Sequence, residues 1–415
     1  MAKTLYICYF GVREPLVQTQ VIPYLLEIAK DEIEVTLLTF EPNMKEKWTA
    51  EQIESERVKL SEKGIAWLCR AYHKSPSVPA TAYDIFSGAW YIGQLLRKEK
   101  YDVLHGRVHI PTLIGALARK LSKHKPKLLF DIRGFFPEEY TDAGVWPENG
   151  WLYRSAKRVE KWLLEEADGF VVLTEKAREI LFPESKETGF DRFERPVEVI
   201  PCCVDIEKFK TANEFSRREA RAELEIGDRR VIAYVGSFGG WYLTDEMLEL
   251  FAAAKKQDPN SFALIFTQRD TESIKARLRE KGFSDSEFYV GSVTPGELPK
   301  YLSAADAAVS FIKACYSKQS SSPTKIAEYL ACGLPIIANR GVGDIDLQLG
   351  GGDVGVLLDG FEEEKYASAL GRIEELGDVA NICRETAARE FDLETVGGIR
   401  YRRMYSRLLE SEELV

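Results

Sequence analysis

Residues 320–338 read SSSPTKIAEYLACGLPIIA, and this stretch decides how the second half of the chain is interpreted. Ser322 is a good N-cap residue and Pro323 suits the first position of a helix, so a helix is predicted to begin there. It is predicted to end at Gly333, a residue type that commonly follows a helix. The apolar run LPIIA then predicts a buried strand, and a helix that leads into a strand is half of an α/β unit.

The start of this predicted helix has the properties of an anion-binding site. Its first backbone N–H groups have no partner within the helix, and they carry the positive end of the helix dipole. Lys325 lies in the first turn, where a cation is unfavourable by about 0.3–1 kcal/mol unless an anion binds beside it. Glu328 lies on the same helix face, where a carboxylate can accept hydrogen bonds from a ribose. The predicted diphosphate cradle consists of Ser321, Ser322, Thr324 and Lys325. The alternative is a solvated, well-capped surface helix.

Short β-rich runs alternate with helical segments along the rest of the chain. The runs are apolar on both faces, as expected of strands covered by helices on both sides. They begin at residues 4, 33, 65, 101, 127, 169 and 197, and the pattern restarts with runs at residues 229, 261, 287, 307 and 334. Helices are predicted over residues 18–30, 49–63 and 244–256, among others. The pattern predicts an α/β fold of two doubly wound, Rossmann-like domains that face each other across a cleft.

Length and composition agree with this organisation. The 415 residues exceed the size at which one core stops growing, so two domains are expected. The predicted domains are residues 1–205 and 206–390, and residues 391–415 form a helix that crosses back to the first domain. The net charge of −10 argues against nucleic-acid binding. Seven scattered cysteines without a CxxC pair indicate reduced thiols and a cytoplasmic location.

In parallel sheets of this kind, ligands bind at the carboxyl ends of the strands. This rule singles out Gly11, His105 and Arg133 in the first domain. His105 ends a run, so its imidazole is expected to point into the cleft, toward a donor or acceptor hydroxyl. Arg133 is expected to clamp a phosphate or carboxylate bidentately, with Asp131 orienting it. The alternatives are a structural role for His105 and an internal ion pair between Asp131 and Arg133. His105 and His109 lack a third partner, so no metal site is predicted.

The stretch SSPTKIAEYLACGLPIIAN resembles the donor-binding helix of retaining glycosyltransferases of the GT-B fold, in the large family of bacterial polysaccharide and lipid-linked mannosyl- and glucosyltransferases. The segments FGVREPLVQTQVIPYL, FDIRGFFPEEY, VIPCCVDIEKF and GVGDIDLQL match further family elements in order. The resemblance implies that Glu328 holds the donor ribose and that Gly11 faces the donor phosphates or the acceptor. It also implies catalysis with retained anomeric configuration, without a bound metal or other cofactor.

The sequence departs from the family pattern at two places. Many members carry two glutamates eight positions apart, and the earlier position here is Ser320. Many also carry an arginine and a lysine after the first strand of the second domain, where this chain reads GSFGGWYLTDEM and has neither. Gly236 and Ser237, which begin this segment, are predicted to bind the donor. Lys325 is the first candidate to replace these two cations in binding the donor phosphates, and Arg269 is the second. Trp241 and Tyr242, in the same segment, pack either on the donor or on the end of the sheet.

The predicted function is therefore transfer of a sugar from a nucleotide-sugar to a glycan, a lipid-linked molecule or a small molecule. His105, Asp131 and Arg133 are the predicted catalytic residues. A predicted helix begins at Trp151, ends at Leu164 and combines basic and aromatic residues, which suggests peripheral contact with the inner face of a membrane. Two rival functions remain open, namely a nucleotide-sugar hydrolase or epimerase, and a scaffold that binds a nucleotide without transferring anything.

Overall fold

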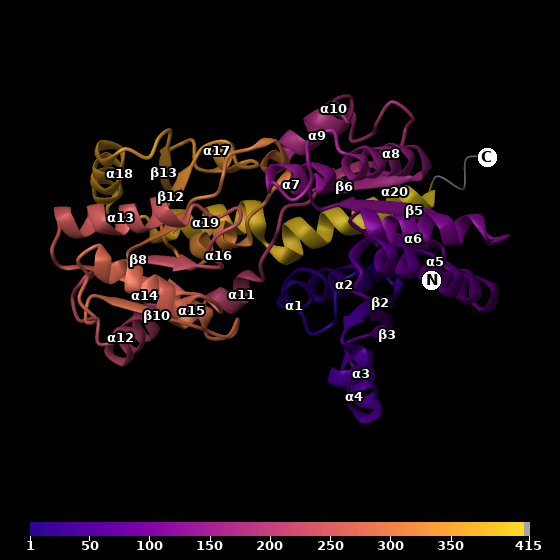
Figure 1. The fold of residues 1–415 in the computed structure, drawn as a ribbon, viewed down its shortest axis with the longest axis horizontal. Helices are drawn as coiled ribbons and strands as arrows, with labels where there is room; N and C mark the ends of the chain where they lie inside the picture. The colour runs from indigo at the N-terminus through magenta and orange to yellow at the C-terminus, as the bar shows by residue number, and fades with distance from the viewer. Residues whose placement is uncertain (411–415) are drawn as a thin grey trace. The chain divides into compact units, whose positions relative to one another are not determined.

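The computed structural model describes residues 1–410 and divides the chain into two compact units. Unit 1 runs from Met1 to Pro201 and resumes at Leu393, and unit 2 comprises Cys202–Asp392. The C-terminal segment predicted over residues 391–415 thus belongs mostly to unit 1, and its last five residues lie outside the described part of the chain. Each unit is built around one parallel sheet (Figure 1).

Unit 1 contains a seven-stranded sheet of order β3-β2-β1-β4-β5-β6-β7, with every pairing parallel. The strand order reverses between β1 and β4, and such a reversal leaves room for a ligand at the carboxyl ends of the strands. The strands are β1 (Lys3–Cys8), β2 (Glu34–Pro42), β3 (Ile65–Tyr72), β4 (Val103–Arg107), β5 (Lys127–Ile132), β6 (Gly169–Val172) and β7 (Val197–Val199).

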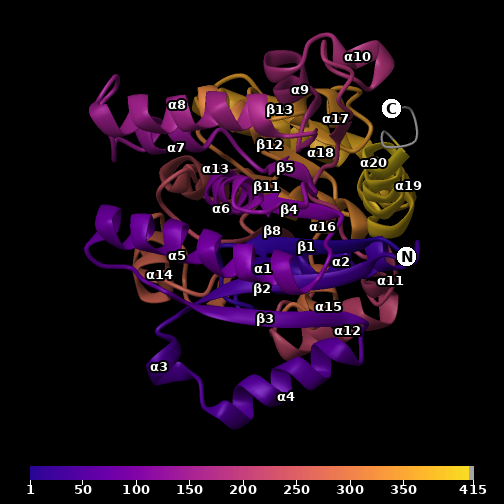
Figure 2. The same cartoon turned by 90° about the vertical axis from the view of Figure 1, so that its right-hand side faces the viewer.

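Helices cover both faces of this sheet (Figure 2). α6 packs between α5 and α8 in one layer, while α2 packs against α20 and the short π-helix η2 (Leu393–Gly398) that precedes it. The helices of unit 1 are α1 (Pro15–Gln20), α2 (Ile22–Ala29), α3 (Met44–Lys47), α4 (Ala50–Ser61), α5 (Ser77–Lys98), α6 (His109–Lys120), α7 (Phe136–Asp142), α8 (Trp151–Glu166), α9 (Glu175–Leu181), α10 (Ser185–Thr188) and α20 (Ile399–Glu410).

Unit 2 contains a six-stranded parallel sheet of order β10-β9-β8-β11-β12-β13, which reverses between β8 and β11. Its strands are β8 (Arg230–Val235), β9 (Ser261–Phe266), β10 (Phe288–Gly291), β11 (Ala307–Ser310), β12 (Ile336–Asn339) and β13 (Gly355–Leu358). Its helices are α11 (Ile206–Phe209), α12 (Glu214–Glu223), α13 (Thr244–Gln257), α14 (Thr271–Glu280), α15 (Leu298–Leu302), η1 (Tyr316–Ser320, a 3-10 helix), α16 (Thr324–Ala331), α17 (Ile345–Gln348), α18 (Glu363–Leu376) and α19 (Ala380–Phe391).

The predicted α/β fold with two doubly wound sheets is confirmed, and three local predictions need correction. Residues 18–30 form two helices, α1 and α2, because the backbone leaves the helical region at Val21, two residues before Pro23. The strand β13 was not predicted, since its apolar run follows a glycine-rich loop and itself begins with a glycine. The C-terminal helix is regular only from Ile399 onward.

Candidate functional site

α16 is fixed at the carboxyl edge of the sheet of unit 2 by buried side chains. The hydroxyl of Tyr329, on α16, accepts a hydrogen bond of 2.8 Å from the backbone N–H of Val235, the last residue of β8. Asn339, which ends β12, holds the backbone of Ile312 by accepting from its N–H at 2.8 Å and donating to its carbonyl oxygen at 2.9 Å. The chain before α16 is therefore anchored where ligands bind in this fold class.

The start of α16 differs by one residue from the prediction. The helix begins at Thr324, after Pro323, and no side chain caps it by a hydrogen bond. Ser322 is not its N-cap, because the Ser322 hydroxyl instead accepts a hydrogen bond of 3.0 Å from the backbone N–H of Cys202. The end of the helix is as predicted, with Gly333 at a φ of +82°. The first N–H groups of α16 are thus left without a side-chain cap, as a site for an external anion requires.

Lys325 lies in the first turn of α16 and is only 7% exposed. Its ammonium lies 4.3 Å from the ring centre of Tyr234 and 4.2 Å from that of Tyr242, and it donates to the Tyr234 hydroxyl at 3.3 Å. Gly236 makes room for it, since a Cβ there would lie 2.9 Å from the ammonium nitrogen. Among the described residues, no carboxylate forms an ion pair with this ammonium. It is a buried cation held by aromatic faces at a helix start.

Glu328, one turn further along α16, is partly exposed. Burial of the carboxyl raises the pKa of Glu328 to about 7, although the nearby charge of Lys325 acts in the opposite direction. Burial likewise lowers the pKa of Lys325 to about 7, against the effect of Glu328. Both groups are therefore near the midpoint of their titration at neutral pH, which is common at functional sites.

These pKa values predict a pH dependence for the binding of inorganic pyrophosphate. The protonated form of Lys325 attracts the anion, and this form is present below about pH 7 and lost above it. We expect the affinity to fall as the pH rises from about 6 to about 9, by up to tenfold per pH unit above the pKa. Calorimetric titration measures this directly. Lys325→Met retains the titration of the ligand and of Glu328, and Lys325→Met/Glu328→Gln retains that of the ligand alone, so the two controls separate the three contributions. An identical pH profile for the wild type and Lys325→Met would contradict this assignment.

The other residues predicted to bind the donor occupy different positions around α16. Ser321 and Thr324 flank the helix start and are partly exposed. Ser237, after β8, is exposed, and its carbonyl oxygen accepts from the Tyr234 hydroxyl at 2.5 Å. Arg269 lies in the exposed loop after β9. The structure thus gathers Gly236 and Lys325 directly and leaves Arg269 at the surface, so its role stays a prediction.

The sequence interpretation missed Lys318, in η1. Its ammonium lies 4.1 Å from the ring centre of Trp241, just as that of Lys325 lies on Tyr242. Trp241 and Tyr242 therefore pack on the core, in agreement with the expected packing on the end of the sheet, and each also carries a lysine ammonium over its ring, which was not predicted. No sequence signal pointed to Lys318, because it lies in a short 3-10 helix without a recognisable pattern.

In unit 1, three of the predicted residues lie together. Asp131 is fully buried in β5, with Arg133 and Arg107 at 3.7 Å and His105 at 3.6 Å. Its Oδ2 accepts a hydrogen bond of 2.9 Å from the hydroxyl of Tyr401 on α20. Burial alone would raise the pKa of Asp131, but Arg133, His105 and Arg107 outweigh it and lower the pKa to about 2.

The predicted position of His105 at a strand end is wrong. β4 continues to Arg107, because Gly106 and Arg107 pair with β5, and His105 is completely buried in mid-strand. Its Nδ1 lies 2.9 Å from the hydroxyl of Tyr405, and its ring packs on that of Tyr6. Burial lowers the pKa of His105, so the neutral imidazole is favoured. This environment agrees with the structural alternative for His105 and not with an imidazole that points to a substrate.

Gly11 lies after β1 and is closely surrounded. A Cβ at this position would lie 2.8 Å from Cδ of Pro42 and 2.9 Å from a carboxylate oxygen of Glu41. The N–H of Gly11 donates to Glu14 at 3.1 Å. Gly11 therefore permits a tight loop, while the adjacent residues Phe10 and Glu14 line the neighbouring pocket.

This pocket, of about 580 Å³, lies at the carboxyl end of the sheet of unit 1. Arg133 and His109 contribute to its wall, and Val108 between β4 and α6 has a φ of +61°, which is strained for a β-branched residue. Strain of this kind is concentrated at functional sites. The aromatic lining consists of Tyr9, Phe10, Phe40, Tyr72, Phe136 and Tyr140, and the charged lining includes Glu14, Lys74, Arg133 and Glu139.

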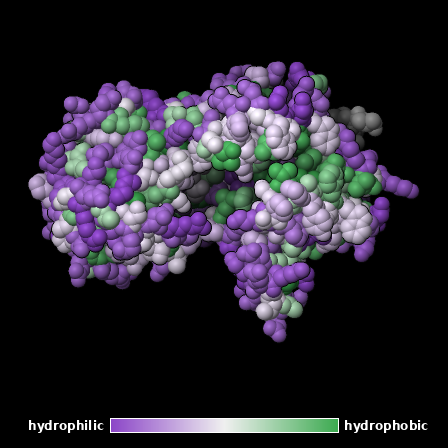
Figure 3. Space-filling model, in the orientation of Figure 1, coloured by the Kyte–Doolittle hydropathy of each residue, from purple (hydrophilic) through white to green (hydrophobic). Residues whose placement is uncertain are grey.

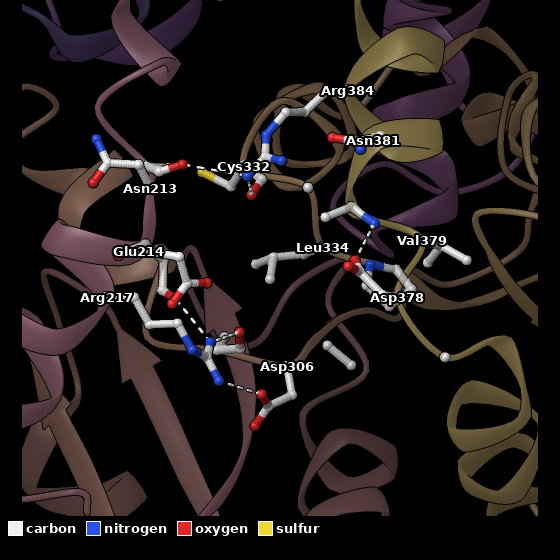
Figure 4. Close-up of a pocket in the computed structure, with 18 of the residues that line it drawn as sticks. Asn213, Glu214, Arg217, Asp306, Cys332, Leu334, Asp378, Val379, Asn381 and Arg384 are labelled. Atoms are coloured by element: carbon white, nitrogen blue, oxygen red, sulfur yellow. Dashed lines mark hydrogen bonds and ion pairs between the residues drawn. The ribbon is translucent and has the colours of Figure 1, made fainter. Parts of the chain in front are cut away.

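A larger pocket of about 960 Å³ lies at the opposite, amino edge of the sheet of unit 2 (Figure 4). Its arginines are engaged by the protein itself: Arg217 donates to Asp306 at 2.6 Å, and Arg384 donates to the carbonyl oxygens of Ala212 and Cys332 at 3.3 Å. These contacts join loops and helix ends. The arginines that line the pocket therefore have structural roles, and the pocket lies away from the start of α16.

No helix within residues 1–410 is long and apolar enough to cross a membrane. Within the same range, no group of three or more His, Cys, Asp or Glu side chains is placed to hold a metal ion.

Comparison with known proteins identifies both halves. Residues 17–208 match the model described as Glycosyltransferase Family 4, and residues 216–390 match the model described as Glycosyl transferases group 1. A D-inositol 3-phosphate glycosyltransferase of Corynebacterium jeikeium is 25% identical over 228 residues, which is 53% of this chain and 52% of that protein. The chain thus spans about half the length of this relative.

Solved structures share the whole fold at low sequence identity. Sucrose-phosphate synthase from Thermosynechococcus elongatus superimposes with a TM-score of 0.71 at 16% identity, covering 99% of this chain and 100% of that one. Anabaena HepE, solved in complex with UDP and glucose, has a TM-score of 0.66 at 15% identity, with 99% and 100% covered.

Proposed function

The chain belongs to the glycosyltransferases of family 4, and from this membership we propose that it transfers a sugar from a nucleotide-sugar to an acceptor hydroxyl. The observation that carries the proposal is the unpaired, buried ammonium of Lys325 at the uncapped start of α16. A buried cation that has no carboxylate in ion-pair contact costs free energy, and a bound diphosphate would lower that cost. Glu328, partly exposed one turn away, is placed to accept hydrogen bonds from a ribose.

In the proposed reaction, the bond between the anomeric carbon and the diphosphate breaks while the acceptor oxygen bonds to that carbon from the same side. Lys325 and the first N–H groups of α16 stabilise the negative charge of the departing diphosphate. The departing phosphate takes the proton of the acceptor hydroxyl, so no covalent nucleophile is needed. The configuration at the anomeric carbon is retained.

The experiment is a turnover assay with UDP-, GDP- and ADP-linked sugars, with and without a panel of glycan, inositol phosphate and lipid-linked acceptors. Release of nucleoside diphosphate that depends on an acceptor supports transfer. Equal release without any acceptor would show a hydrolase instead, and a changed sugar without release would show an epimerase. Binding without turnover of any donor would leave only the scaffold interpretation.

We propose that the helix start and Lys325 take the place of a divalent cation, and that no cofactor is used. Activity is therefore expected to be unchanged, within about twofold, in excess EDTA, because the charge of the leaving group is already compensated. A chelation series with magnesium and manganese added back checks this expectation. Complete loss that either metal restores would contradict it.

We propose that the acceptor binds in the aromatic pocket of unit 1, with Arg133 on an anionic or hydroxyl group. Arg133→Lys is expected to raise the acceptor KM about tenfold and to leave donor affinity unchanged, because lysine cannot reproduce a planar, bidentate contact. Steady-state kinetics at saturating donor, with donor affinity measured by calorimetry, test this. Unchanged acceptor kinetics would leave Arg133 as a structural partner of Asp131.

We also propose a cytoplasmic protein that contacts the inner face of a membrane through α8. In support, Trp151 and the basic residues Arg154, Arg158 and Lys161 are exposed on this helix. The second tryptophan, Trp162, is partly covered and carries the ammonium of Lys120 over its ring at 4.9 Å. α8 therefore offers mainly positive charge and one exposed aromatic ring.

A further inference from the structure

α5 presents large apolar side chains to solvent along one face. Tyr83, Phe86 and Trp90 are 59%, 68% and 62% exposed, and their spacing of three and four residues places them in one stripe. Leu121, just after α6, is also exposed and adjoins α5, since a Cβ on Gly93 would lie 3.7 Å from that of Leu121. In Figure 3, the surface over α5 and α6 carries apolar and weakly polar residues, coloured green and white.

The stripe is not needed to attach α5 to the core, because the opposite face of α5 is already buried there. Ala89, Ile92 and Leu96 on that face belong to the core of unit 1. Exposed large apolar residues in unit 2 are isolated instead, each on a different element: Phe215, Tyr316, Leu347 and Ile382. Single exposed residues need no explanation, whereas a contiguous stripe marks an interaction surface.

The layer that carries the stripe is positively charged. α5, α6 and α8 hold eight lysines and arginines against four acidic residues, in a chain whose net charge is −10. Three of the eight, Arg119, Lys120 and Lys157, form ion pairs with acidic side chains. The exposed basic residues that remain are Arg97, Lys98, Arg154, Arg158 and Lys161. Two of the four acids, Asp84 and Glu160, are buried in contact with histidines, so they do not face outward. No exposed acidic residue interrupts α5, and its last turn ends with the exposed residues Arg97 and Lys98.

We propose that the outer face of the α5–α6–α8 layer docks on an anionic lipid bilayer, with Tyr83, Phe86 and Trp90 inserted at the interface. Aromatic rings with one polar group favour this depth, and lysines and arginines gain energy near anionic headgroups. The aromatic side chains of α5 insert into the interface, while the basic side chains of α8 add positive charge to the docking face. Ser77 and Thr81 of α5 also line the aromatic pocket, so docking would bring that pocket to the membrane surface. The last step, an acceptor drawn from the lipid surface, rests on the proposed function.

Charge favours a bilayer over a second copy of the chain as the occupant. A symmetric dimer through this face would bring two copies of the same basic layer together, and like charges in contact oppose association. An anionic membrane complements both the charge and the apolar stripe.

The experiment is co-sedimentation with vesicles of phosphatidylcholine alone and of phosphatidylcholine with about one third phosphatidylglycerol. We expect binding to the anionic vesicles that weakens as salt is raised. The variant Tyr83→Ser/Phe86→Ser/Trp90→Ser should lower the partition coefficient at least about tenfold, because three interfacial side chains are lost. The control Phe215→Ser removes an equally exposed ring from unit 2 and should bind like the wild type.

Absence of wild-type binding to anionic vesicles, or equal binding by the triple variant, would overturn the proposal. A dimer that the triple variant abolishes, with no vesicle binding, would assign the stripe to a second copy instead. The vesicle assay contains no sugar donor, so its result does not depend on the proposed function. A protein that binds vesicles but shows no sugar turnover in the separate turnover assay would therefore contradict the proposed function and not membrane docking. Turnover of a water-soluble acceptor by the triple variant at the wild-type rate would show that the variant is folded and that only docking is lost.

Discussion

Glu328→Ala is expected to weaken binding of a nucleoside diphosphate by about ten- to a hundredfold. A hydrogen bond to a charged group contributes roughly 1.5–3 kcal/mol, and about 1.4 kcal/mol corresponds to a factor of ten in affinity. The carboxyl is partly exposed on α16, so its removal leaves no buried partner unsatisfied and the loss reports on the ligand contact. The loss should be the same for the complete nucleotide-sugar, because both ligands contain the ribose.

Calorimetric titration of the purified variant measures this effect, and melting temperature verifies that the fold is intact. Glu385→Ala is the matched control, since Glu385 is an exposed glutamate on α19 of the same unit. It should bind the nucleotide like the wild type. If Glu328→Ala also bound like the wild type, the ribose would have to contact another residue.

Asp131→Ala is expected to lower the free energy of unfolding of unit 1 by about 3–5 kcal/mol. The carboxylate lies between Arg107 and Arg133, so its removal leaves two buried guanidinium groups without their shared anion. It also removes the acceptor for the Tyr401 hydroxyl, which ties α20 to β5. Loss of this size corresponds to a melting transition lowered by roughly 10 °C.

The same carboxylate predicts how stability depends on pH. Its pKa in the folded state is about 2, below the unfolded value of about 3.9, so its contribution is complete above about pH 5 and is lost progressively as the pH falls through about 2. Thermal unfolding of wild type and Asp131→Ala between about pH 2 and 6 measures the difference, which should shrink toward acid pH. A constant difference, or a variant as stable as the wild type, would show that Asp131 does not hold this cluster together.

The fold could be predicted because both of its signals are local. Apolar runs with helices between them repeat at regular intervals, and Gly333 marks the boundary between α16 and β12. The exceptions are equally local. Pro23 splits a helix, and glycines before and within β13 obscure its apolar run.

The surroundings of His105 could not be predicted, because they depend on residues 300 positions later. Tyr405 on α20 covers the imidazole, and Tyr401 on the same helix holds Asp131. A sequence window around His105 shows only the end of an apolar run. Asp131 and Arg133 were grouped correctly because they are two residues apart, whereas their partners come from distant elements.

The cations of the donor site show the same limit. Lys325 could be identified from its place in a helix start, but the aromatic rings that hold its ammonium come from β8 and the loop after it. Lys318 lies in a 3-10 turn without a recognisable pattern, and only the structure reveals Trp241 beside it. The strained backbone of Val108 leaves no trace in the sequence at all.

The central claim is that the start of α16 holds the donor diphosphate through Lys325. Titration of wild type and Lys325→Ala with inorganic pyrophosphate, which has no ribose, tests it most directly. We predict that Lys325→Ala binds pyrophosphate about ten- to a hundredfold more weakly than the wild type, while Glu328→Ala binds it equally well. Equal pyrophosphate affinity of the wild type and Lys325→Ala would contradict the assignment of this helix as the donor site.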